Sequence, residues 1–180
     1  MQKGLEQYNK HASELLAFLN QVHDIGATDD LKVPSIVVAG NQSVGKSSVI
    51  EAITGIPFPK NKDTCTRCPI ECRLQESDCP WTCQVSLHFN FDDDGNKLDK
   101  PRIVAFGDPI TDISLVEEHI FRAQAAILNP SSDSAAYLES TDYMNESCLD
   151  ALFTRNTVCI EIKGRDVGNL TLVDLPRLYS

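Results

Sequence analysis

The sequence predicts an α/β fold with a mixed, mostly parallel sheet and flanking helices. An apolar segment at residues 36–39 leads through a glycine-containing turn into a helical pattern, as in a strand-turn-helix unit. Two later segments alternate apolar and polar residues in the manner of half-buried strands. Two further strand-like segments lie at residues 157–164 and 169–176. The chain has 180 residues, 42% of them hydrophobic, which is enough for one sizeable core. We therefore expect a single globular domain.

Charge and composition exclude several classes of protein. The formal net charge is -10, which argues against a non-specific nucleic-acid binder, because such a protein presents a basic surface. No apolar run approaches the roughly 20 residues that span a bilayer, and residues 1–16 lack the apolar core of a signal peptide. A cytosolic protein is the simplest interpretation, and it favours free thiols for the seven cysteines.

The first half of the chain contains four predicted elements. Helical spacing of apolar residues predicts an amphipathic helix over residues 2–22. Residues 36–39 are apolar on both faces, which indicates a central strand, and residues 46–54 read as a short helix that ends at Gly55. Alternation predicts half-buried strands over residues 68–75 and 83–91.

The second half continues the alternation of helix and strand. Ser114 and Glu117 form a candidate capping box for a helix that ends before Pro130, with one apolar face made by Val116, Ile120, Ala123 and Ile127. Residues 129–143 read as a polar loop. The segments TVCIEIKG and NLTLVDLP then predict two strands that a turn-prone segment connects.

Residues 40–47, GNQSVGKS, match the phosphate-loop pattern G-x-x-x-x-G-K-[ST] between a predicted strand and a predicted helix. The glycines let successive backbone N–H groups curl around a phosphate, and the following helix presents its positive end. Lys46 would reach the outer phosphates and Ser47 would bind magnesium. The pattern predicts nucleotide binding and a P-loop NTPase fold.

Four segments, in this order, resemble the large GTPases related to dynamin: GNQSVGKSSVIEAITGIPFP, CTRCP, FGDPITD and NLTLVDLP. Within that family the sequence is most similar to the myxovirus-resistance type and its fungal dynamin-like relatives. The resemblance implies an N-terminal helix and linker at residues 1–32 and the N-terminal portion of a dynamin-type GTPase domain at residues 33–180. This domain would be incomplete at its C-terminal side, because the guanine-specifying TKxD segment does not occur before residue 180.

The resemblance also assigns roles to residues. It implies that GTP and Mg²⁺ are bound and that GTP is hydrolysed to GDP and phosphate. Gln42 and Thr66 would act in hydrolysis, and Ser47, Thr66 and Asp174 would bind magnesium, with Asp174 acting through water. The nucleotide would contact Gly40, Asn41, Gln42, Ser43, Val44, Gly45, Lys46, Ser47 and Ser48.

In the family, hydrolysis is coupled to self-assembly through the GTPase domain and to membrane remodelling. The resemblance thus implies a cytoplasmic protein that is recruited to organelle membranes or microtubules through regions outside these residues, and that does not bind nucleic acid. In the family's strand order, residues 36–39 lie between the strand ending at Asp174 and a later strand. We therefore expect an open sheet edge and near-background hydrolysis for the 180-residue chain alone.

The sequence departs from the family pattern at two places. Arg177 stands where the family has the glycine of Asp-Leu-Pro-Gly, and Asn61 and Asp63 stand where dynamin has glycines that hold a monovalent cation. Arg177 favours an alternative function, a non-hydrolysing interaction module that retains the fold. An ATP-using kinase with the same loop is a third possibility, which Thr66 and VDLP fit poorly.

Two further patterns have competing interpretations. The spacings of Cys65, Cys68, Cys72, Cys79 and Cys83 are compatible with zinc, but alternation puts Cys68, Cys72 and Cys83 on apolar faces, which favours core thiols. NFDDDGNKLDKP begins like a calcium loop but has Pro101 at the position of the bidentate glutamate, which favours a solvated hairpin tip. The leading helix is either part of a bundle that joins the GTPase domain to a stalk or a packed amphipathic helix.

Overall fold

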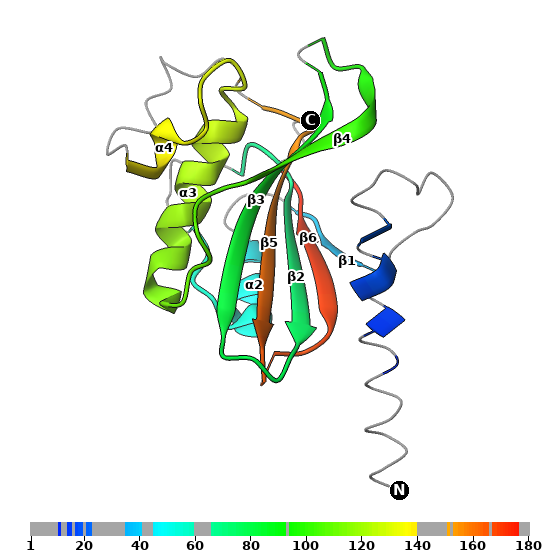
Figure 1. Ribbon diagram of the computed structural model, residues 1–180, viewed down its shortest axis with the longest axis vertical. Coiled ribbons are helices and arrows are strands. Elements are labelled where there is room, and N and C mark those ends of the chain that lie inside the picture. Colours follow the sequence, from blue (N-terminus) through cyan, green and yellow to red (C-terminus); the bar gives the residue numbers. More distant parts are fainter. Residues whose placement is uncertain are drawn as a thin grey trace, which may run out of the picture.

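The structure is a computed structural model that describes residues 11, 14–15, 17–19, 21–22, 35–40, 45–59, 66–92, 94–139, 151, 153–165 and 167–176. Its described strands form one sheet of six in the order β1-β6-β2-β5-β3-β4 (Figure 1). Their bounds are β1 Ile36–Val38, β2 Ile70–Glu76, β3 Thr82–Phe91, β4 Lys97–Ala105, β5 Thr157–Gly164 and β6 Leu170–Asp174. The helices are α2 Lys46–Thr54, the 3-10 turn η1 Ile113–Leu115, α3 Val116–Ile127 and α4 Ala136–Glu139.

The predicted α/β class and the mixed sheet are confirmed, but the sheet is not mostly parallel. β1 pairs with β6, and β2 with β5, in parallel, whereas β2–β6, β3–β5 and β3–β4 are antiparallel. The connection between β3 and β4 is a tight turn, which only antiparallel neighbours allow. β5 and β6 follow one another in the chain but do not pair, because β2 lies between them.

One face of the sheet carries the apolar core. α2 lies behind the sheet in Figure 1 and α3 lies beside β3, and both contribute to a single buried cluster with the strands. The opposite side chains of β2 and β5 are polar, with Arg73 bonded to Glu71 and Lys163 paired with Glu161. The predicted alternation in β2 and β3 is confirmed. The cluster includes Ile50, Ile70, Val85, Leu87, Ile120, Ile127, Ile160, Ile162 and Leu172.

The helix ends follow local chemistry. Gly55 ends α2 as predicted, with a φ of 72° that favours glycine and an N–H that donates to the Glu51 carbonyl at 2.8 Å. The helix at α3 is also confirmed, but the capping box is wrong. Asp112, not Ser114, caps this segment, because its side chain accepts the Ser114 N–H at 3.0 Å and starts η1.

Three other predictions concern less regular segments. The described residues of the predicted leading helix, 11, 14–15, 17–19 and 21–22, are helical, and the rest of that prediction lies outside the described residues. The polar loop contains the short helix α4. Residues 92 and 94–96 form a solvated turn between β3 and β4, in which Asp92 accepts the Asn96 N–H at 2.8 Å. Among the described residues, no helix has the length and apolar character to cross a membrane.

β1 lies at one edge of the described sheet. The expectation that residues 36–39 form a central strand with two covered faces is therefore wrong. The expectation that this strand has an open edge in the 180-residue chain is confirmed. Among the strands that the structure describes, β1 pairs only with β6, and Ile36 and Val37 are 51% and 54% exposed. The opposite edge, β4, carries Lys97, Lys100 and Pro101, which protect an edge against further pairing. The sequence IVV of β1 has no such protection.

We predict that the 180-residue chain self-associates through β1 and that Val37→Lys reduces this association. A lysine on the exposed edge opposes pairing with another strand. Light scattering after size exclusion should show wild-type masses above the 19.9 kDa of one chain and a Val37→Lys mass close to it. Ile103→Lys, on the protected β4 edge, is the matched control and should leave association unchanged. A monomeric wild type would contradict this prediction.

Three of the cysteines compatible with zinc are core thiols. Cys68, Cys72 and Cys83 are at most 1% exposed and pack in the apolar cluster, whereas Cys79 is exposed and Cys65 lies outside the described residues. Burial raises the pKa of both Cys68 and Cys83 to about 12, and it also raises the pKa of Cys72. The interpretation as core thiols is confirmed for these three residues.

We therefore predict that iodoacetamide at pH 8 labels Cys79 in the folded chain and leaves Cys68, Cys72 and Cys83 unmodified, because the thiolate is the reacting form. Peptide mass spectrometry would measure each site, and labelling in denaturant would show that all four can react. Labelling of Cys68 or Cys83 at the rate of Cys79 would show that the apolar cluster is not closed.

Candidate functional site

Three strands bring the candidate site together at one end of the sheet. Val38 of β1 lies opposite Asp174 of β6 in a parallel pair, so both strands end at the same edge. β2 runs antiparallel to β6 with Ile70 opposite Asp174, and this brings the residues just before β2 to the same place. Gly40, Thr66 and Asp174 therefore converge although they are far apart in sequence. The carboxyl ends of strands in such sheets are the usual position of ligand sites.

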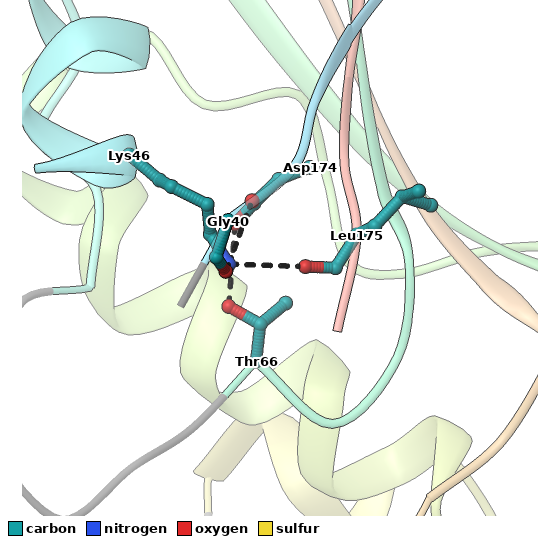
Figure 2. A network of polar contacts seen from close by, with 5 residues as sticks. All are labelled: Gly40, Lys46, Thr66, Asp174 and Leu175. Carbon is teal, nitrogen blue, oxygen red and sulfur yellow. Dashed lines mark hydrogen bonds and ion pairs between the residues drawn. The ribbon is translucent and has the colours of Figure 1, made fainter. Parts of the chain in front are cut away.

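Lys46 occupies the centre of this region (Figure 2). Gly45 precedes α2 with a φ of 91°, a left-handed conformation that favours glycine and turns the loop into the helix. The Lys46 ammonium donates to the Gly40 carbonyl at 2.9 Å and to the Leu175 carbonyl at 3.3 Å, and it lies 4.0 Å from Asp174 Oδ1. The Lys46 ammonium thus joins the ends of β1 and β6.

Thr66 and Asp174 are directly bonded. The Thr66 hydroxyl donates to Asp174 Oδ2 at 3.2 Å, and Asp174 is only 2% exposed. Burial raises the pKa of Asp174, while the nearby Lys46 charge and the Thr66 hydrogen bond oppose that increase. Asp174 Oδ1 is buried and accepts no hydrogen bond in the described part of the chain. This unsatisfied oxygen could accept a metal ion or a donor.

Ser47, Thr66 and Asp174 line one small pocket, which the start of α2, the residues before β2 and the end of β6 enclose with α3. The three residues predicted to bind magnesium are therefore together. They supply two hydroxyls and one carboxylate, which suits a hard cation that takes oxygen ligands and keeps waters and phosphates as its remaining ligands. Within the described residues there is no cluster of three or more His, Cys, Asp or Glu that could hold a different metal.

The other predicted site residues fall into two groups. Gly40, Gly45 and Lys46 lie together as described, and Ser48 is exposed at the start of α2. Asn41, Gln42, Ser43, Val44 and Arg177 lie outside the described residues, so their predicted roles are not tested. The same applies to Asn61 and Asp63.

Sequence reasoning missed two features of the site. The carbonyls of Gly40 and Leu175 bind Lys46, and no side-chain pattern indicates a backbone acceptor. Gln124 of α3 also lines the pocket and is only 4% exposed. A signal for Gln124 was present, because it follows Ile120 by four residues and so lies on the apolar face of the helix.

Comparison with known proteins agrees with this arrangement. Residues 36–179 match the model of the dynamin family. Interferon-induced GTP-binding protein Mx2 of Sus scrofa is 30% identical over 88% of this chain and 17% of its own length. Mx1 of Bos taurus, another interferon-induced GTP-binding protein, is 31% identical over 94% of the chain and 21% of its own length.

A fish relative, interferon-induced GTP-binding protein Mx of Dicentrarchus labrax, is 28% identical over 95% of the chain and 21% of its own length. The chain thus spans about a fifth of the length of these relatives. The family match covers most of the chain, including the phosphate loop, Thr66 and Asp174, and the chain therefore belongs to the dynamin family of GTPases.

Proposed function

We propose that this chain binds GTP with Mg²⁺ through residues 40–48 and forms part of the GTPase domain of a dynamin-like enzyme that hydrolyses GTP to GDP and phosphate. One observation carries the proposal: the Lys46 ammonium lies at the end of a phosphate-loop segment, 4.0 Å from Asp174, which Thr66 contacts directly. The names of the Mx relatives describe them as GTP-binding. Guanine is favoured over adenine on that similarity.

Lys46 is arranged to exchange its partners for a phosphate. It now donates to two neutral carbonyls, from Gly40 and Leu175. A phosphate oxygen is a charged acceptor, and a charge-assisted bond is roughly twice as strong as a neutral one. The N-terminal end of α2, where Lys46 lies, adds the partial positive charge of the helix. In an acidic chain, this local concentration of positive charge is what would bind the nucleotide.

Ser47, Thr66 and Asp174 are the residues that would hold magnesium, which neutralises charge on the phosphates when bound. Asp174 would act through water from its buried carboxylate, and Ser47 and Thr66 would supply their hydroxyls. In this role the Thr66 hydroxyl would give up its bond to Asp174, and the Thr66 backbone would position the attacking water. Gln42 would act beside Thr66 in hydrolysis, as the family resemblance implies.

The remaining expectations follow from the family and belong to the whole protein. We propose that hydrolysis is coupled to self-association of GTPase domains and to membrane remodelling by a cytoplasmic protein, recruited to organelle membranes or microtubules. The alternative function, a non-hydrolysing interaction module, is favoured by Arg177. The two differ in one measurable respect, because a module of that kind would not release phosphate from GTP.

We predict that Lys46→Ala lowers the affinity for GTP at least about 30-fold, because a hydrogen bond to a charged group contributes about 1.5–3 kcal/mol and Lys46 makes more than one. Titration with a fluorescent GTP analogue would measure this. Lys97→Ala, at the exposed start of β4, is the matched control and should bind normally.

Equal affinity of Lys46→Ala and wild type would exclude the phosphate-loop function. The same titrations with an ATP analogue would test the guanine preference, and tighter ATP binding would assign the chain to another class of NTPase.

We predict that Thr66→Ala slows phosphate release about 100-fold and changes GTP affinity much less, since its proposed role lies at the metal and the attacking water. Thr66→Ser retains the hydroxyl and should keep most of the activity. Single-turnover phosphate release would be measured in a longer form of the protein that contains these 180 residues, because near-background hydrolysis is expected of the 180-residue chain alone. Unchanged release in Thr66→Ala would mean that Thr66 is an ordinary residue before β2.

A further inference from the structure

Gln124 is a buried polar side chain in an otherwise apolar part of α3. It is 4% exposed, and its neighbours Ala123, Ala125 and Ala126 are buried as well. In the part of the chain that the structure describes, its side-chain amide makes no hydrogen bond to another residue. Its amide atoms are not among the fully buried polar atoms that lack a partner in the described chain, so the amide reaches the small pocket that Gln124 lines. An amide at a pocket without a protein partner is available to a neighbouring polar group or to a ligand.

The pocket that Gln124 lines contains a possible partner for the amide. Asp174 lines the same pocket and has a buried carboxylate oxygen, Oδ1, without a hydrogen bond. Glutamine offers two N–H donors, and a carboxylate only accepts, so the two groups are chemically complementary. The cavity between the lining residues has a volume of about 10 Å³, close to the space that one water needs. The amide can thus donate a hydrogen bond to the Asp174 carboxylate, either directly or through a single water.

We propose that Gln124 is a positioning residue for the state in which magnesium and a nucleoside triphosphate are bound. In that state its side-chain amide donates to the Asp174 carboxylate, either directly or through one water. This inference rests on the proposed function. Thr66 now donates to Asp174 Oδ2 at 3.2 Å. A Thr66 hydroxyl that binds the metal would give up this bond, and Gln124 would then keep the carboxylate oriented.

The nucleotide states should therefore differ in their dependence on Gln124. With a triphosphate and magnesium bound, Thr66 has left Asp174, and Gln124 is its remaining donor. With GDP bound, there is no γ-phosphate to draw Thr66 away, so Asp174 keeps the Thr66 bond. Loss of the amide should weaken binding of the triphosphate far more than binding of the diphosphate.

The test compares Gln124→Met with wild type, because methionine has nearly the shape of glutamine without its donors and acceptor. We expect the affinity for Mg²⁺·GTPγS to fall about tenfold, and the affinity for Mg²⁺·GDP to fall less than twofold, in fluorescence titrations. The affinity for GTPγS in excess EDTA should not change. Gln124→Glu, which places a second carboxylate beside Asp174, should lower the affinity for Mg²⁺·GTPγS at least as much as Gln124→Met does.

A second readout needs no nucleotide. If Gln124 is retained for function, removing its unpaired amide should leave the melting temperature of the nucleotide-free chain unchanged or raise it. Ile120→Met is the matched control, since it alters a buried residue one turn earlier in α3 without changing polarity. It should lower the melting temperature slightly and leave the ratio of GTPγS to GDP affinity at the wild-type value.

Two results would overturn the inference while leaving the proposed function intact. One is an equal loss of GTPγS and GDP affinity in Gln124→Met, and the other is a marked fall in its melting temperature, which would make Gln124 a structural residue. If wild type binds neither nucleotide, the proposed function fails, and the inference fails with it.

Discussion

The parallel pairing of β1 with β6 places Val38 opposite Asp174, and both strands end there. The loop after β1 therefore begins beside the only carboxylate among the predicted magnesium ligands, and Lys46 can contact the carbonyls that follow both strands. β2, antiparallel to β6, adds Thr66 to the same point. If this pairing shifted by one residue, Asp174 would turn to the opposite face of the sheet, because side chains alternate along a strand.

The two edges of the sheet are chemically different, and this difference bears on how the chain behaves in solution. β4 carries lysines and a proline, which discourage further pairing, and Arg102 covers the ring of Phe89 with its guanidinium 3.9 Å from the ring centroid. β1 is short and apolar, and Val49 and Ile53 of α2, the next element in the chain, are also exposed. The site therefore lies next to the less protected edge, so association at β1 would also affect the loop that follows it.

The site contains a buried polar atom that accepts no hydrogen bond in the described part of the fold, and Thr171 Oγ1 of β6 is another such atom. The opposite sheet face pairs its charges locally, as Arg73 does with Glu71 at 2.9 Å. At the site, by contrast, Asp174 Oδ1 is buried without a hydrogen bond, and Gln124 is buried beside it. Such groups lower stability and provide binding energy when a ligand arrives, which is the usual exchange between stability and function at a binding site. The raised pKa of Asp174 has the same physical origin, because burial disfavours its charge.

Local patterns in the sequence predicted most of the elements and the phosphate loop. Strand alternation, the apolar face of α3 and the stop at Gly55 are set by neighbouring residues, so one sequence suffices to read them. Lys46 and Ser47 were identifiable because their chemistry depends on a fixed short spacing. Thr66 and Asp174 needed the family resemblance, and Gln124 was missed, because their proximity arises from residues 66, 124 and 174 packing at one pocket. Strand order, the edge position of β1 and the antiparallel share of the sheet were also decided only in the tertiary structure, since they depend on pairing between segments distant in the chain.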